Sequence, residues 1–185
     1  MSAATAGTST VTTWKIDPAH SVAEFKVKHM MIANVKGKFT GISGTLSLDE
    51  ADPARSSVEA TIPLGTVFTG DAQRDTHLKS PDFFDVEKHP QMMFRSTRIE
   101  VKNPGRLAVT GSLSIHGVSQ SVTFEVEGPT LPAKDPWGNT RVGLEASTKI
   151  NRKDFGLGWN TALETGGVLV GEDVAITLDV EFVKA

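Results

Sequence analysis

The feature that most constrains the fold of this chain is an alternation of apolar and polar residues with a period of two. Residues 23–28 read Ala-Glu-Phe-Lys-Val-Lys, and residues 174–182 place Val, Ile, Leu, Val and Phe at every second position. Runs of the same kind occupy residues 58–62, 107–115, 122–127 and 142–150. Because successive side chains of a strand point to opposite faces, this pattern predicts strands that bury one face and expose the other.

Short turns separate several of these runs. Residues 103–105 read Asn-Pro-Gly and residues 116–119 read His-Gly-Val-Ser, which are compositions that tight hairpin turns prefer. Hairpins join antiparallel neighbours, so we expect eight or nine antiparallel strands. Only residues 70–88 depart from the alternation of apolar and polar residues. Residues 71–79 predict one short helix, and Ser80 is a candidate N-cap for a further helical turn. The predicted fold class is therefore all-β with a short helical insertion.

Strands with one polar face bury the other face either in a sandwich of two sheets or in a closed barrel. Several residues on the inward faces are too small to fill the middle of a closed sheet. They are Ala23, Ala60, Ser96, Gly111, Ala146 and Thr148. An eight-stranded barrel has room for a small ligand, so these residues favour a cavity. The alternative is that the phenylalanines fill the core without a ligand.

Composition excludes several classes of function. A chain of 185 residues with a formal net charge of −3 has the size of one domain and lacks the basic field that nucleic acids require. The absence of cysteine excludes disulfides, thiolate metal sites and a cysteine nucleophile. No apolar run approaches the roughly 18 to 20 residues that span a bilayer, so the protein is not expected to be membrane-spanning.

The first residues are small and hydroxylated, without the apolar segment of a signal peptide. We expect residues 1–13 to form a flexible N-terminal tail and residues 14–185 to form the barrel domain. As the sequence stands the expected location is cytoplasmic, and it is periplasmic or secreted if the chain is a trimmed mature form.

Five sequence blocks occur in a fixed order along the chain. The blocks are residues 16–29 (beginning Ile-Asp-Pro-Ala-His-Ser), 36–41 (Lys-Gly-Lys-Phe-Thr-Gly), 78–86 (ending Ser-Pro-Asp-Phe-Phe-Asp-Val) with His89, Pro90, Phe94 and Ser96, 111–118 (Gly-Ser-Leu-Ser-Ile-His-Gly-Val) and 151–157 (Asn-Arg-Lys-Asp-Phe-Gly-Leu). Together they resemble the YceI-like family, the bacterial polyisoprenoid-binding proteins. The resemblance implies an eight-stranded, antiparallel, lipocalin-like barrel that holds a long isoprenoid or another aliphatic chain. It also implies a non-enzymatic carrier or storage protein that forms a homodimer. The expected ligands are a polyprenyl diphosphate, a quinone-like lipid or a long-chain fatty amphiphile.

We expect the ligand-binding residues to fall into two groups. The tunnel wall, taken from the inward positions of the strands, comprises Phe25, Val27, Phe39, Ile62, Phe94, Leu113, Phe124, Leu144 and Ile176. Large apolar side chains in irregular segments could cap a mouth of the barrel, and these are Phe83, Phe84, Phe155 and Trp159. For each residue the alternative role is ordinary core packing.

A polar head group needs hydrogen-bond donors near one opening, and Arg152 is the first candidate because a guanidinium binds an oxyanion through two hydrogen bonds. Its alternative role is a structural ion pair with Asp154 or a neighbouring acid. Second choices are Asp17 with His20, and Asp71 with Arg74 and His77.

Enzyme motifs are absent from the chain. The five histidines include no His-Glu-x-x-His motif, and no serine lies in a Gly-x-Ser-x-Gly turn. We therefore predict no catalytic residue, no metal and no cofactor. The alternatives are a lipid-modifying hydrolase or isomerase that uses His20 or His77 as general base, and an interaction module with a filled core.

Overall fold

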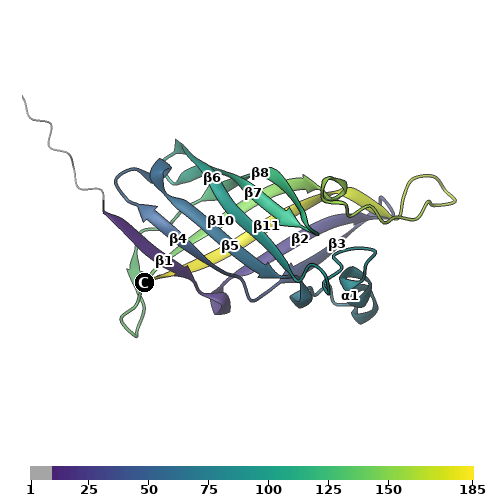
Figure 1. Cartoon of the computed structure of the whole chain (residues 1–185), viewed down its shortest axis with the longest axis horizontal. Helices are drawn as coiled ribbons and strands as arrows, with labels where there is room; N and C mark the ends of the chain where they lie inside the picture. Colours follow the sequence, from purple (N-terminus) through teal and green to yellow (C-terminus); the bar gives the residue numbers. More distant parts are fainter. Residues whose placement is uncertain (1–9) are drawn as a thin grey trace, which may run out of the picture.

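A computed structural model describes residues 10–185 and shows an elongated β-barrel (Figure 1). Its strands are β1 (Val11–Ile16), β2 (Val22–His29), β3 (Ala33–Phe39), β4 (Ser43–Asp49), β5 (Ser57–Pro63), β6 (Gln91–Asn103), β7 (Arg106–Ile115), β8 (Val118–Glu127), β9 (Ala133–Lys134), β10 (Thr140–Asn151) and β11 (Val170–Lys184). The α-helix is α1 (Ala72–Lys79), and single 3-10 turns occupy Pro18–His20, Pro53–Arg55, Leu64–Thr66 and Arg152–Phe155.

Eight of the strands in the described part of the chain close into a ring. Around the ring the order is β1, β4, β5, β6, β7, β8, β10 and β11, and β11 returns to β1. Each of these pairs is antiparallel. The prediction of an eight-stranded antiparallel barrel is therefore confirmed, and the sandwich is not the architecture.

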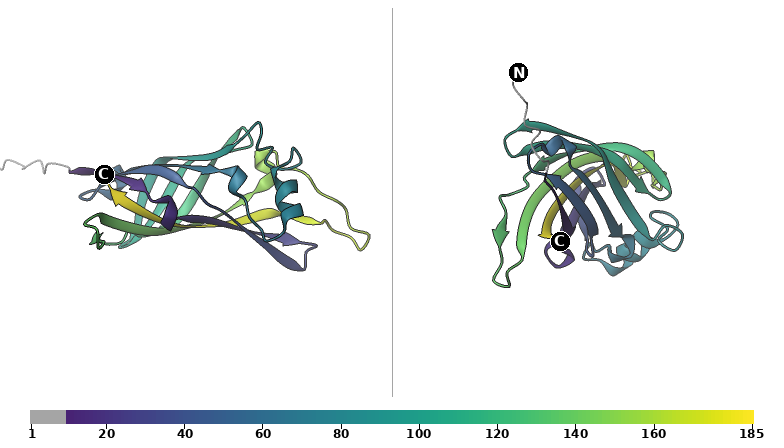
Figure 2. Two further views of the ribbon diagram at one scale, coloured as in Figure 1. Left: turned by 90° about the horizontal axis from the view of Figure 1, so that it is seen from below. Right: turned by 60° about the vertical axis from the view of Figure 1, so that its left-hand side comes forward.

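The long strand β11 makes the barrel extended rather than short. One edge of β11 pairs with β10 from Asp173 to Val183. Its other edge pairs first with β2 and then with β1, because the 3-10 turn Pro18–His20 divides that edge into two strands. The β2–β3 hairpin consequently projects at one end of the barrel, where α1 also lies, while the C-terminus lies at the other end (Figure 2, left).

Helix α1 begins and ends as its flanking residues dictate. The Asp71 carboxylate accepts a hydrogen bond from the Arg74 amide, which caps the first turn. Ser80 is the C-cap of α1, and its hydroxyl also accepts a hydrogen bond from the Asp82 amide (3.3 Å), as the predicted N-cap would, but the residues that follow form a turn and no further helix. The amides of Phe84 and Asp85 donate to the carbonyls of Leu78 and Ser80, so the chain folds back on the end of the helix as a turn.

The boundary predicted for the N-terminal tail is wrong at its last residues. Val11 and Thr13 lie in β1, where they pair with Asp49 and Ser47 of β4. The carbonyl of Thr13 also accepts a hydrogen bond from the amide of Ala185. These backbone pairs order a segment whose small side chains gave no strand signal. The rest of the predicted tail, residues 1–9, lies outside the described residues.

Candidate ligand-binding site

The barrel encloses a long apolar cavity with a volume of about 760 Å³. Its lining reaches from His77, Phe83 and Trp159 at the end that carries α1 to Pro104 and Pro132 at the opposite end. This volume falls in the range of about 300–1,000 Å³ typical of small-molecule sites. We refer to this cavity as the tunnel.

Of the predicted ligand-binding residues, all but one line the tunnel. The lining includes Phe25, Val27, Phe39, Ile62, Phe83, Phe84, Phe94, Leu113, Phe124, Leu144, Arg152, Trp159 and Ile176. Phe155 is the exception: it does not line the tunnel, and with only 1% of its surface exposed it packs in the core below the turn Arg152–Phe155. Lining residues that the prediction omitted include Ile42, Met92, Leu178 and Val180. Alternation alone could have supplied the last two, which share a face with Ile176.

The tunnel is an unfilled space rather than a packed core. Phe25, Ala60, Phe94, Leu144 and Ile176 face inward and nevertheless remain only partly buried. All five side chains line the tunnel, so their exposed surface belongs to the surface of the tunnel. A core filled by the phenylalanines would have buried them completely.

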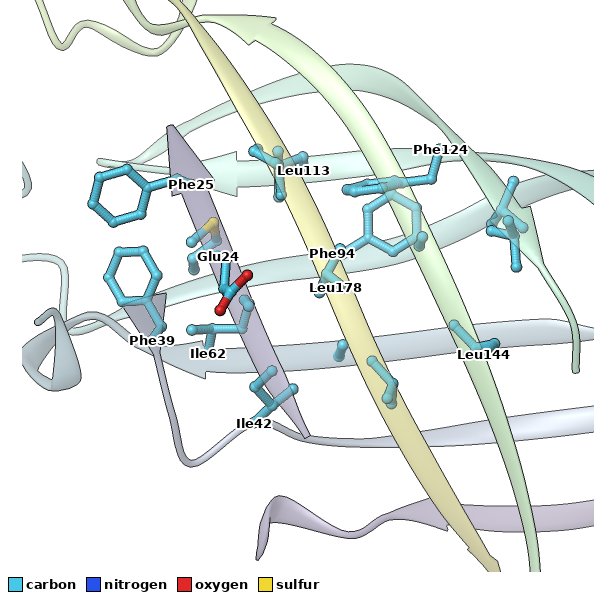
Figure 3. A pocket seen from close by; sticks show the side chains of 18 of the residues that line it. Glu24, Phe25, Phe39, Ile42, Ile62, Phe94, Leu113, Phe124, Leu144 and Leu178 are labelled. Carbon is cyan, nitrogen blue, oxygen red and sulfur yellow. The ribbon is translucent and has the colours of Figure 1, made fainter. Parts of the chain in front are cut away.

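Two pairs of phenylalanine rings lie along the wall of the tunnel (Figure 3). The ring centroids of Phe25 and Phe39 are 5.5 Å apart, and those of Phe94 and Phe124 are 5.2 Å apart. Phe25 lies over its cross-strand partner Gly37, where a Cβ atom would overlap the phenyl ring. Glycine in this strand therefore lets the ring lie against the wall and keeps the middle of the tunnel open.

Arg152 lines the tunnel, but its N–H groups donate hydrogen bonds to backbone carbonyls. Its Nε donates to the carbonyl of Gly171 (2.7 Å), and its two terminal nitrogens donate to Leu157 (2.5 Å), Trp159 (2.9 Å) and Val170 (3.2 Å). Burial of the guanidinium, which is 4% exposed, lowers the pKa of Arg152. Among the described ion pairs none joins Arg152 to Asp154, and the neighbouring acid Glu172 acts on it only through a coulombic interaction that raises its pKa. With four hydrogen bonds already made, Arg152 fixes the loop of residues 157–171 and has little left for a head group.

Other polar side chains lie at the mouth of the tunnel beside α1. His77 lines the tunnel, and its Nε2 lies 2.8 Å from an Asp82 carboxylate oxygen. The His77 ring packs edge-on against Trp159 and Phe83, with centroids 4.7 Å and 5.1 Å away. Arg74 also lines the tunnel and donates to Thr69. Of the second-choice head-group residues, the structure therefore brings Arg74 and His77 to this mouth.

The other second-choice pair lies away from the tunnel. The Asp17 carboxylate is 2.9 Å from His20 Nδ1 and accepts a hydrogen bond of 2.7 Å from Arg141. Arg141 also binds Asp135 and Glu181, at 2.7 Å each. Arg141 is the main cause that lowers the pKa of Asp17 to about 2, with a second contribution from His20. This cluster joins the Pro18–His20 turn to β10, β11 and the loop before β10, and its members Asp17, His20 and Glu181 also place one potential metal-ligand atom each within 4.8 Å of one another.

A group of three potential metal ligands was not foreseen from the sequence. Asp85, His89 and His116 place one ligand atom each within 4.8 Å of one another, and Asp85 is only 8% exposed. The two imidazole centroids are 4.9 Å apart. His116 comes from the β7–β8 turn, far along the sequence from the other two, which is why a search for closely spaced ligands misses the group.

No helix in residues 10–185 has the length and apolar character needed to cross a membrane.

The closed barrel and its apolar tunnel define an extended β-barrel protein of the lipocalin-like architecture. The model of the YceI-like domain matches residues 14–182, and the chain belongs to this family. A UPF0312 protein of Serratia proteamaculans is 37% identical over 182 residues, which are 97% of this chain and 91% of that protein. The crystal structure of BcnA from Burkholderia cenocepacia has a TM-score of 0.76 at 25% identity, covering 90% of this chain and 98% of BcnA.

A third structure, a polyisoprenoid-binding domain from Saccharophagus degradans, shares the fold at low sequence identity. Its TM-score is 0.66 at 14% identity, and the match covers 95% of this chain and all (100%) of that domain.

Proposed function

We propose that this protein binds a polyisoprenoid or a similar long-chain amphiphilic lipid in its tunnel and carries or stores it without chemical change. The observation that carries the proposal is the row of inward apolar side chains that remain partly exposed to an unfilled tunnel. Family membership supports it, as does the shared fold of a polyisoprenoid-binding domain.

The dimensions of the barrel suit an elongated ligand. Strand β11 has 15 residues, which span about 50 Å at about 3.3 Å per residue. With a strand tilt of about 40°, the barrel is roughly 38 Å long along its axis. Burial of hydrocarbon contributes about 0.8 kcal/mol per methylene, so an apolar chain gains affinity with length and needs no charged anchor inside the tunnel.

A polar head group would lie at the mouth beside α1. Arg74 and His77 supply nitrogen atoms there, and Trp159 supplies an aromatic surface. A diphosphate would be held by the guanidinium, whereas a quinone-like ring would pack on the indole. The homodimer and the cellular compartment expected from the sequence stay predictions.

One observation favours an alternative function, a lipid-modifying hydrolase or isomerase. His77 lies on the tunnel with Asp82 at 2.8 Å, an arrangement in which a carboxylate could orient a histidine general base. His20 does not line the tunnel, so this alternative depends on His77. We favour the carrier because His77 sits at the mouth, packed between aromatic rings, whereas most of the tunnel is hydrocarbon.

The test is to identify what the protein holds. Protein purified from cells without added lipid is extracted with organic solvent, and the extract is analysed by mass spectrometry. The delipidated protein is then titrated with a long-chain prenyl diphosphate and, in parallel, with a long-chain fatty acid. A lipid of defined mass and saturable uptake of either probe are expected. Repeated extraction of nothing, together with no uptake of either probe, would overturn the proposal.

A further inference from the structure

The tip of the β2–β3 hairpin exposes three consecutive large apolar side chains. Met30, Met31 and Ile32 have 41%, 58% and 80% of their surface exposed. They lie at the end of the barrel that carries α1 (Figure 1). Single exposed apolar side chains are ordinary on a protein surface. Three consecutive ones on one projecting tip indicate an interaction surface. We call these three residues the hairpin tip.

The backbone of the hairpin tip is unfavourable for the residues it carries. Met30 and Met31 have positive φ angles, 52° and 62°, and the turn closes with a hydrogen bond from the Ile32 amide to the His29 carbonyl (3.2 Å). Left-handed backbone at both turn positions favours Asn and Gly, and methionine is rarely found there. A turn chosen for stability alone would not place two methionines here, so their side chains have a use that offsets the strain.

The strands that lead to the hairpin tip carry a row of lysines on their outer face. Lys26 of β2 lies directly opposite Lys36 of β3, and across β11 the same row continues through Ala175 to Lys149 of β10. Lys28 lies between this row and the hairpin tip. All four lysines are exposed, and no ion pair of residues 10–185 involves any of them. Like charges directly opposite one another destabilise a sheet, so this row also points to an external anionic partner.

The hairpin tip adjoins the mouth of the tunnel. His29, the residue before Met30, lines the tunnel, and so do Leu169 and Val170. The amide of Met30 donates to the carbonyl of Leu169 (2.8 Å), which ties the hairpin tip to the rim of the mouth. A surface that contacts the hairpin tip therefore also contacts the opening.

We infer that the hairpin tip inserts into the surface of an anionic lipid bilayer and docks the α1 end of the tunnel on the membrane. Lysines about 7 to 13 Å behind the hairpin tip, at about 3.3 Å per residue along the strands, would meet the phosphate groups as the apolar side chains enter the acyl region. This arrangement combines buried apolar area with electrostatic attraction, the two contributions that hold peripheral proteins on anionic membranes. Docking is a property of the outer surface and does not require the proposed cargo.

A fluorescent label at the hairpin tip tests the docking directly. The chain contains no cysteine, so Ile32→Cys provides a single site for a polarity-sensitive nitrobenzoxadiazole dye. The matched control is Leu131→Cys, because Leu131 is 89% exposed and lies before β9 at the other end of the barrel. We expect a blue shift of the Ile32→Cys label with vesicles of phosphatidylcholine and phosphatidylglycerol, and none for the Leu131→Cys label. No shift of the Ile32→Cys label, or an equal shift of both labels, overturns the inference.

Charge variants test the role of the lysines in a vesicle sedimentation assay. Lys26→Gln with Lys36→Gln is expected to weaken binding to the anionic vesicles about thirtyfold, because each lysine near such a surface contributes about a fivefold gain in binding. Lys134→Gln, which removes an exposed lysine in β9, is expected to leave binding unchanged. Equal affinity of the double variant and the unchanged protein contradicts the inference.

The two proposals fail separately. The vesicles contain no polyisoprenoid, so vesicle binding reports docking alone, whereas solvent extraction reports the contents of the tunnel. A protein that docks but yields no lipid and takes up neither probe overturns the carrier function only, and a protein that yields lipid but does not dock overturns the docking only.

Discussion

The substitution Ala60→Phe separates an open tunnel from a packed core by the sign of its effect on stability. Ala60 faces the tunnel from β5 and is only partly buried. Its neighbours across the sheet are Gly44, which has no side chain, and Phe94. A phenyl ring at this position therefore extends into unfilled space and covers apolar wall on several sides.

The size of the effect follows from the area that the ring would bury. Complete burial of a phenylalanine side chain contributes about 1.5–3 kcal/mol, and a ring in a partly open tunnel would gain about 1.5 kcal/mol, near the lower limit. A change of 1 kcal/mol shifts the Tm of a domain of this size by about 2–4 °C, so the expected increase in Tm is about 3–6 °C. The same ring would obstruct the tunnel, and the amount of bound lipid should fall.

Two measurements are made on separate samples. Thermal unfolding is measured on the delipidated protein, and the bound lipid is extracted and quantified from protein that has not been delipidated. Thr61→Phe is the matched control, since residue 61 is the next in β5 and does not line the tunnel. The control should keep its lipid. If Ala60→Phe instead lowers Tm, because overpacking costs about 1–3 kcal/mol of stability, the interior is filled and the reasoning is refuted.

Three further changes give distinct expected results. Arg141→Gln should lower the free energy of unfolding by about 1 kcal/mol at neutral pH, because Arg141 is the largest of several causes that lower the pKa of Asp17 from 3.8 to about 2. The depressed pKa of Asp17 stabilises the fold above about pH 4, and this stabilisation is lost as the pH falls to 2. Denaturant unfolding of the variant should therefore show a free energy of unfolding that depends less on pH between 4 and 2. An unchanged pH dependence would contradict this role of Arg141. Gly37→Ala should push the Phe25 ring into the tunnel, with a loss of about 1–3 kcal/mol in thermal unfolding and less extracted lipid; unaltered lipid content would count against the role of this glycine. His77→Ala should leave the extracted lipid unchanged in mass, whereas accumulation of a different lipid would favour the enzyme.

The side chains of the barrel wall could be predicted from the alternation of apolar and polar residues along each strand. Phe25, Phe94 and Ile176 lie on the tunnel because a strand's side chains alternate whatever its partners are, so their direction could be predicted without knowing the topology. The order of the strands could not be predicted in the same way. Strand β11 pairs with β1, β2 and β10, and this arrangement depends on contacts between residues far apart in the sequence.

The roles of irregular segments were the least predictable part of the site. Arg152 has the chemistry of a head-group ligand, but its donors are taken by carbonyls of a loop whose path the sequence does not reveal. Phe155 is as apolar as Phe83, yet the 3-10 turn directs it into the core instead of the tunnel. In strands the period of two decides the direction of a side chain, whereas in turns each residue depends on its own tertiary contacts.

A crystal structure of the protein purified from cells without added lipid would show directly whether the tunnel holds a lipid chain. Continuous elongated density is expected along the tunnel, in contact with Phe25, Phe94 and Leu144, with its bulkier end at the mouth beside α1. A tunnel closed by repacked side chains, or one that contains only ordered water, would contradict the account.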